Sequence, residues 1–104
     1  LLGLEPLRLD MGLVEAARGH SSDMVEHKFF SHESPVEGKR SFSDRAKLAG
    51  TAASGENIAY GSRSGFDTNQ QWFHSPGHHR NMLGNHSRVG IGRSAKHWTE
   101  LFGR

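Results

Sequence analysis

The chain has 104 residues, of which 34% are hydrophobic and 23% are charged, and this fits one small globular domain. Its formal net charge is +2 with the basic residues scattered, which argues against a nucleic-acid partner. The absence of cysteine excludes disulfides, thiol nucleophiles and cysteine-bound zinc, and no apolar run approaches the ~20 residues of a membrane span. Eight histidines and the carboxylates remain as candidate metal ligands.

The first predicted element is a long helix over residues 9–30. Two histidines and four apolar residues recur there at spacings of three and four, which is typical of a helix face turned to a core: Leu9, Leu13, Ala17, His20, Met24 and His27. His20 and His27 lie two turns apart, about 10 Å, too far to hold one metal together, so both are interpreted as core or rim residues. Glycine, proline and charge dominate residues 31–40, so the helix should end near His32 and a loop should follow.

A short second helix is predicted over residues 42–49. Ser41 stands three residues before Asp44, as in a capping box, and Gly50 is a typical C-terminal stop. The residues expected on its buried side are Phe42, Ala46 and Ala49.

The next segment, residues 56–61, is brief, partly apolar and held between glycines. We expect it to cross under the core with Glu56 turned inward. Asp67 can cap a further helix through Phe73, which Pro76 and Gly77 interrupt before a last turn over residues 78–83.

A terminal β-hairpin is predicted around residues 94–96. Two short segments of partial alternation flank that turn, and their apolar residues are Val89 and Ile91, then Trp98, Leu101 and Phe102.

Three motifs place histidine or glutamate beside aromatic, glycine or proline residues: Phe29-Phe30-Ser31-His32, Gly55-Glu56-Asn57-Ile58-Ala59 and Trp72-Phe73-His74-Ser75-Pro76-Gly77-His78. Together they resemble the signature of the CAP superfamily of cysteine-rich secretory, antigen 5 and pathogenesis-related proteins, in its bacterial SCP-like type without cysteines. The resemblance implies an α+β fold, a compact α/β/α sandwich with a small antiparallel sheet between helical layers. It also implies a single domain over residues 1–104 that lacks the start of its first helix.

The resemblance further implies a cleft lined by two histidines and two acidic residues. Its positions correspond here to His32, Glu56 and His78, while the second acidic position is occupied by Ser75. Replacing a carboxylate by a hydroxyl removes a negative charge that would stabilise a bound cation, so the site is a reduced tetrad. His74 or His79 could add a third imidazole, although the resemblance assigns neither of them that role.

This residue set suggests a Zn²⁺ or other divalent metal site with His32 and His78 as ligands. Glu56 is then a third ligand beside a bound water, a catalytic general base acting on that water, or a group that orients a histidine. A metal-free alternative takes Ser75 as nucleophile, His78 as base and Glu56 as orienting acid. The sequence lacks a Gly-x-Ser-x-Gly elbow there, so a capping role at Pro76 explains Ser75 better.

Three functions remain open at this point. The first is a secreted or cell-surface, monomeric binding module that recognises a lipid, glycan, peptide or protein in the cleft. The second is a metal-dependent hydrolase of peptide or cell-wall material, and the third is a metal-free structural or adhesion domain. Four further residues match recurrent positions of the family and are given structural roles, with Arg45 expected to pair across the fold: Arg45, Asn57, Trp72 and Asn81.

Overall fold

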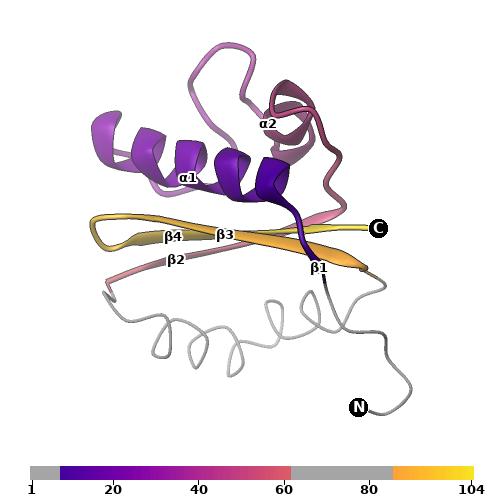
Figure 1. Cartoon of the computed structure of the whole chain (residues 1–104). Helices are drawn as coiled ribbons and strands as arrows, with labels where there is room; N and C mark the ends of the chain where they lie inside the picture. The colour runs from indigo at the N-terminus through magenta and orange to yellow at the C-terminus, as the bar shows by residue number, and fades with distance from the viewer. Residues whose placement is uncertain (1–7, 62–85) are drawn as a thin grey trace.

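The computed structural model describes residues 8–61 and 86–104. Its elements, in chain order, are β1 (Arg8–Leu9), α1 (Met11–Glu26), α2 (Phe42–Leu48), β2 (Gly55–Tyr60), β3 (Arg88–Ser94) and β4 (His97–Gly103). Figure 1 shows α1 and α2 on the same side of the sheet, with α1 running along it. None of the helices in these two ranges is long and apolar enough to cross a membrane.

Helix α1 is shorter than the sequence predicts, and the predicted bounds of 9–30 are wrong at both ends. Leu9 belongs to β1, and Asp10 caps the helix by accepting hydrogen bonds from the backbone N–H groups of Gly12 and Leu13, at 2.8 and 3.2 Å. The helix ends at Glu26, and Lys28 adopts a left-handed backbone with φ of 55°. The predicted core face is otherwise confirmed, because four of its six residues are buried: Leu13, Ala17, His20 and Met24.

Helix α2 follows its sequence signals closely. Ser41 and Asp44 form the predicted capping box, and Gly50 has the left-handed φ of 78° that favours glycine after a helix. Ala46 is fully buried, and Phe42 and Ala49 pack against the core cluster as expected.

The sheet has the strand order β1-β3-β4-β2. Strands β3 and β4 form the predicted hairpin, with Ala95 and Lys96 as its two-residue turn, and β4 pairs antiparallel with β2. Strand β1 adds a parallel pair at the other edge, with Leu9 opposite Val89, so the sheet is mixed. The predicted α+β fold is confirmed.

Arg88 joins three distant segments at the end of the sheet where β1 lies. Its Nη1 donates to the carboxylate of Asp10 and, at 2.6 Å, to the hydroxyl of Thr51. Thr51 in turn donates to Asp10 Oδ2 at 2.8 Å. The residue that caps α1 is therefore held by side chains from the start of β3 and from the segment before β2.

The core lies between α1, α2 and the sheet, and its central cluster is Leu13, Ala16, Ala17, Ala46 and Leu101. Helix α1 approaches β3 so closely that a Cβ on Gly90 or Gly92 would lie 2.3 or 2.2 Å from backbone atoms of the helix. The predicted helix over residues 67–73 and turn over 78–83 lie outside the described residues. The expected truncation of the first helix also stays a prediction, since residues 1–7 are outside them as well.

Candidate functional site

The structure brings two of the predicted site residues into contact. Glu56 is the second residue of β2 and only 5% exposed, which confirms its predicted inward direction. Its Oε1 lies 2.9 Å from Nδ1 of His32, and its Oε2 accepts a hydrogen bond of 2.6 Å from Nη2 of Arg45. The predicted pairing of Arg45 across the fold is thus confirmed, with Glu56 as its partner.

Arg45 also fixes the loop that carries His32. Its Nη2 donates to the carbonyl oxygen of His32 at 3.0 Å, and its Nη1 donates to the carbonyls of Lys39 and Arg40 at 2.9 and 3.2 Å. One buried guanidinium therefore links α2, strand β2 and two parts of the segment between the two helices, at His32 and at residues 39–40. A planar group with several fixed donors is suited to such a position, whereas a lysine ammonium is not.

His32 is much more exposed than Glu56. The side chain of His32 is 54% exposed, while that of Glu56 is fully buried. A neutral imidazole that donates from Nδ1 to the carboxylate carries its lone pair on Nε2. Within residues 8–61 and 86–104, this Nε2 has no hydrogen bond. The geometry thus leaves one ring nitrogen of His32 available to a ligand.

His20 is a core residue, as interpreted from the sequence. It is fully buried, one ring nitrogen lies 2.9 Å from the carbonyl oxygen of Ser31, and the ring packs edge-on against Phe29. Burial lowers the pKa of His20, so the ring is neutral at neutral pH.

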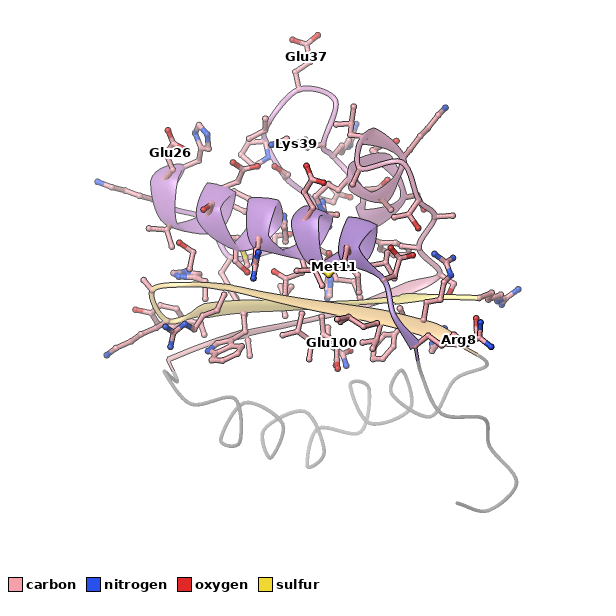
Figure 2. All side chains as sticks on the ribbon, in the orientation of Figure 1. Arg8, Met11, Glu26, Glu37, Lys39 and Glu100 are labelled. Carbon is pink, nitrogen blue, oxygen red and sulfur yellow. The ribbon has the colours of Figure 1, made fainter. Side chains whose placement is uncertain are left out.

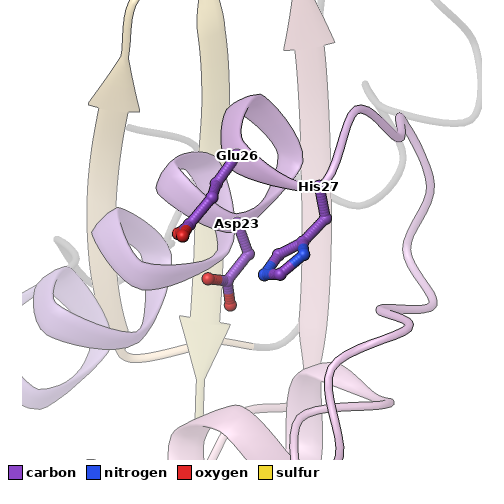
Figure 3. Close-up of side chains that lie close together, drawn as sticks. All are labelled: Asp23, Glu26 and His27. Atoms are coloured by element: carbon purple, nitrogen blue, oxygen red, sulfur yellow. The ribbon is translucent and has the colours of Figure 1, made fainter.

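His27 is exposed at the end of α1 and lies beside two carboxylates that sequence analysis did not connect with it. Ligand atoms of Asp23, Glu26 and His27 all lie within 4.8 Å of one another, as Figure 3 shows. The signal was present, because residues at i, i+3 and i+4 share one helix face. Asp23 already accepts a hydrogen bond of 3.3 Å from Lys39, which competes with any cation there.

Glu100 was also missed by sequence analysis. It lies in β4, is 5% exposed and accepts a hydrogen bond of 3.2 Å from the side-chain amide of Asn57. Burial raises the pKa of Glu100 to about 7. Figure 2 shows it on the sheet face opposite α1. The sequence shows only a glutamate next to the apolar residues Leu101 and Phe102, and this does not reveal its burial.

The remaining predicted site residues lie outside the described part of the chain. They are Ser75 and His78, the candidate third imidazoles His74 and His79, and the structural candidates Trp72 and Asn81. Their placement relative to His32 and Glu56 stays a prediction.

Comparisons with known proteins agree on the kind of domain. The sequence model of the family described as "CAP: Cysteine-rich secretory protein family" matches residues 1–99. In Bacillus subtilis (strain 168), the uncharacterized protein YkwD is 37% identical over 96% of this chain and 40% of its own length. The uncharacterized membrane protein YlbC of the same organism is 36% identical over 96% of this chain and 29% of its own. The chain thus spans less than half the length of either relative.

Two solved structures resemble the fold. An extracellular protein containing an SCP domain, from Bacillus anthracis strain Ames, matches with a TM-score of 0.91 and 33% identity, over 99% of this chain and 35% of that one. An outer surface protein of Borrelia burgdorferi matches with a TM-score of 0.78 over 99% of this chain and 80% of that one. The second match is only 17% identical, so it bears on the fold alone.

Proposed function

Because the chain belongs to the CAP, or cysteine-rich secretory protein, family, we propose that it is an extracellular domain that binds a divalent metal ion through His32 and His78. A small ligand or a partner would be recognised at the same site. The extracellular assignment is supported by the similar SCP-domain protein of Bacillus anthracis, which is described as extracellular.

The observation that carries this proposal is the contact between Glu56 and His32. Histidines that bind metals almost always donate their other ring N–H to a carboxylate or carbonyl, which fixes the tautomer and makes the ligand nitrogen more basic. Here Nδ1 of His32 meets the Glu56 carboxylate at 2.9 Å, and the half-exposed ring presents Nε2. Arg45 donates to the other oxygen of the same carboxylate. The orientation of the His32 ring is therefore set before any ligand binds.

The donor set fits zinc. Imidazole nitrogens are preferred zinc ligands, and a site with few protein ligands keeps positions for water or for a ligand. Bound there, the ion would supply a Lewis acid that polarises an oxygen ligand. His78 is the second donor in this proposal, and Ser75 replaces a carboxylate that would have added negative charge.

The contacts of Glu56 favour binding over hydrolysis. One carboxylate oxygen accepts from Arg45 and the other faces His32 Nδ1. A general base must reach the reacting water, and the Glu56 side chain is fully buried behind the half-exposed ring of His32. We therefore assign Glu56 the role of positioning His32, and keep the hydrolase as the alternative.

Calorimetric titration of Zn²⁺ into the protein at pH about 7.5 and about 5.5 tests the proposal, because imidazoles must be neutral to bind metal. Binding should be tight at the higher pH and lost at the lower one. It should also be lost in His32→Ala and in His78→Ala.

His27→Ala is the matched control, since it removes an exposed histidine from the end of α1. Zn²⁺ binding that both His32→Ala and His78→Ala leave unchanged would refute the proposed site. Hydrolytic turnover abolished by Glu56→Gln with Zn²⁺ binding retained would favour the hydrolase instead.

A further inference from the structure

An open groove lies between the C-terminal end of α1 and the turn that joins β3 to β4, two parts that Figure 1 shows next to each other. Its volume is about 620 Å³, within the range of small-molecule sites. Most of its lining is apolar or aromatic: Met24, Val25, Phe29, Phe30, Tyr60 and Ala95. None of these residues belongs to the His32 and Glu56 site.

Aromatic rings form one wall of the groove and are left open to solvent. Phe30 is 52% and Tyr60 is 59% exposed. The ring of Phe30 lies 6.3 Å from Tyr60 and 6.4 Å from His97, and the last two are 4.6 Å apart, all between ring centroids. Contiguous exposed rings of this kind are typical of binding surfaces rather than of bare protein surface.

The backbone of the groove is held in an unfavourable conformation at two places. Lys28 and Ala95 have φ values of 55° and 52°, and they are the non-glycine residues with positive φ among residues 8–61 and 86–104. Ala95 occupies the first position of a two-residue hairpin turn, where glycine is preferred. Strained backbone tends to persist where it serves a site, and both strained residues line this groove.

The charge of the groove has one sign. Among the residues that the structure describes, Lys28 and Lys96 line it and no acidic residue does. Neither lysine forms an ion pair within the described ranges, 8–61 and 86–104. His97 is neutral at neutral pH, because burial lowers its pKa, and its buried Nδ1 has no hydrogen-bond partner in the described part of the chain. An apolar lining beside the ammonium groups of these two lysines favours a ligand that is largely apolar and carries a negative charge.

We propose that this groove binds a free long-chain carboxylate, with the alkyl chain against the apolar lining and the carboxylate between Lys28 and Lys96. A sugar would need many more hydrogen-bonding partners than the lining offers, and a cationic ligand would be repelled by both lysines. A peptide would bring backbone polar groups that the apolar walls cannot satisfy. The site is separate from the proposed metal site and does not depend on it.

Decanoate, well below its micellar concentration, is the probe. Its binding to the full chain is followed by calorimetry and by amide shift changes at residues 28–30, 60 and 95–97. Decyltrimethylammonium has the same chain with the opposite charge, and butyrate has the same head without the chain. Decanoate should bind at least about ten-fold more tightly than either.

The variant Lys28→Asn with Lys96→Gln removes both charges, and asparagine tolerates the left-handed backbone at position 28. It should weaken decanoate binding about ten-fold, while Arg18→Gln with Lys47→Gln, the same charge change at exposed sites outside the groove, should leave it within about two-fold. Tyr60→Ala should weaken it by removing ring contact. His32→Ala should leave it unchanged, so this result is separable from the zinc titration.

Three outcomes would overturn the proposal. They are equal affinity for decanoate and decyltrimethylammonium, equal weakening by the control pair of substitutions, and binding to anionic phospholipid vesicles with none to monomeric decanoate. The last result would assign the groove to a membrane surface instead. Circular dichroism confirms that each variant is folded before its affinity is compared.

Discussion

Two buried glutamates on neighbouring strands differ in what surrounds them. Glu56 in β2 and Glu100 in β4 are each 5% exposed. The strands pair so that Glu56 lies opposite Leu101 and Asn57 lies opposite Glu100, which places the two carboxylates on opposite faces of the sheet. The two glutamates are therefore equally buried, and both lie in strands of the same sheet. The groups that contact their carboxylates differ.

Glu56 meets a buried cation and an imidazole, whereas Glu100 accepts a hydrogen bond from an amide, and burial raises its pKa to about 7. Glu100 has no ion pair among residues 8–61 and 86–104, and a buried carboxylate without a cation avoids the cost of a buried charge by holding its proton. One that faces arginine can keep its charge and use it to orient a neighbour. Arg45, rather than the depth of burial, therefore makes Glu56 suitable for a site.

The largest effect should come from removing the cation. Arg45→Met leaves Glu56 buried without its counter-charge and frees three backbone carbonyls, so the free energy of unfolding should fall by about 3–5 kcal/mol. Denaturation in urea measures this. The control is Arg40→Met, because Arg40 is 78% exposed and its ion pair with Glu33 spans 3.8 Å. It should cause no measurable change.

A second variant separates the ion pair from the other contacts of Arg45. Glu56→Gln in the Arg45→Met background removes the buried charge that has lost its arginine, so part of the lost stability should return. If the double variant is as unstable as the sum of the two single ones, the pair is not coupled, and the contrast between the two glutamates fails.

Removing the carboxylate of Glu100 should raise the free energy of unfolding, whereas removing Arg45 should lower it. The folded pKa of Glu100, about 7, lies above the usual 4.5, so folding is favoured while the group is protonated and loses stability as pH rises between these values. Glu100→Gln keeps the shape of the side chain but removes the ionisable group, so the variant should not lose stability as pH rises. The variant should equal the wild type near pH 4.5 and exceed it by about 3 kcal/mol above pH 7. A difference that does not vary with pH would contradict this account.

His32 should matter much less for stability than Arg45 does. Its side chain is 54% exposed and it forms one hydrogen bond to Glu56. His32→Ala should therefore lower the free energy of unfolding by at most about 1 kcal/mol. A loss above about 2 kcal/mol would mean that His32 serves the fold rather than a ligand.

The smallest effect is expected at the exposed group of Asp23, Glu26 and His27. His27→Ala removes a side chain that has no part in the core, so the unfolding free energy should change by less than about 0.5 kcal/mol. Thermal denaturation of the variant beside wild type checks this. A larger change would show that this group, like Glu56, contributes to the folded state.

Local signals predicted much of this molecule. The apolar spacing of α1, the capping box at Ser41 and the hairpin signal around the β3–β4 turn each act over a few residues, and the elements they predict are confirmed. The inward direction of Glu56 was also predicted, although its strand was expected only as a brief segment. These features depend on residues that are close together in the sequence, so the sequence alone is enough to predict them.

What could not be predicted depends on distant contacts. The bounds of α1 were wrong because Leu9 pairs with Val89 instead of extending the helix. The four acceptors of Arg45 come from three segments, and no spacing rule gives their convergence. Glu100 appears in the sequence as one more charged residue, since its burial follows from the sheet and not from its neighbours.

The contact between Arg88 and Asp10 joins positions 78 residues apart, and Asp10 is the residue that caps α1. Contacts between residues so far apart in sequence slow folding. The chain loses the entropy of closing a long loop before the contact can stabilise the structure. A ribosome or a translocation channel delivers the chain N-terminus first, so α1 emerges long before the side chain that secures its first turn. We therefore expect the domain to reach its protease-resistant state only after β3 has been released.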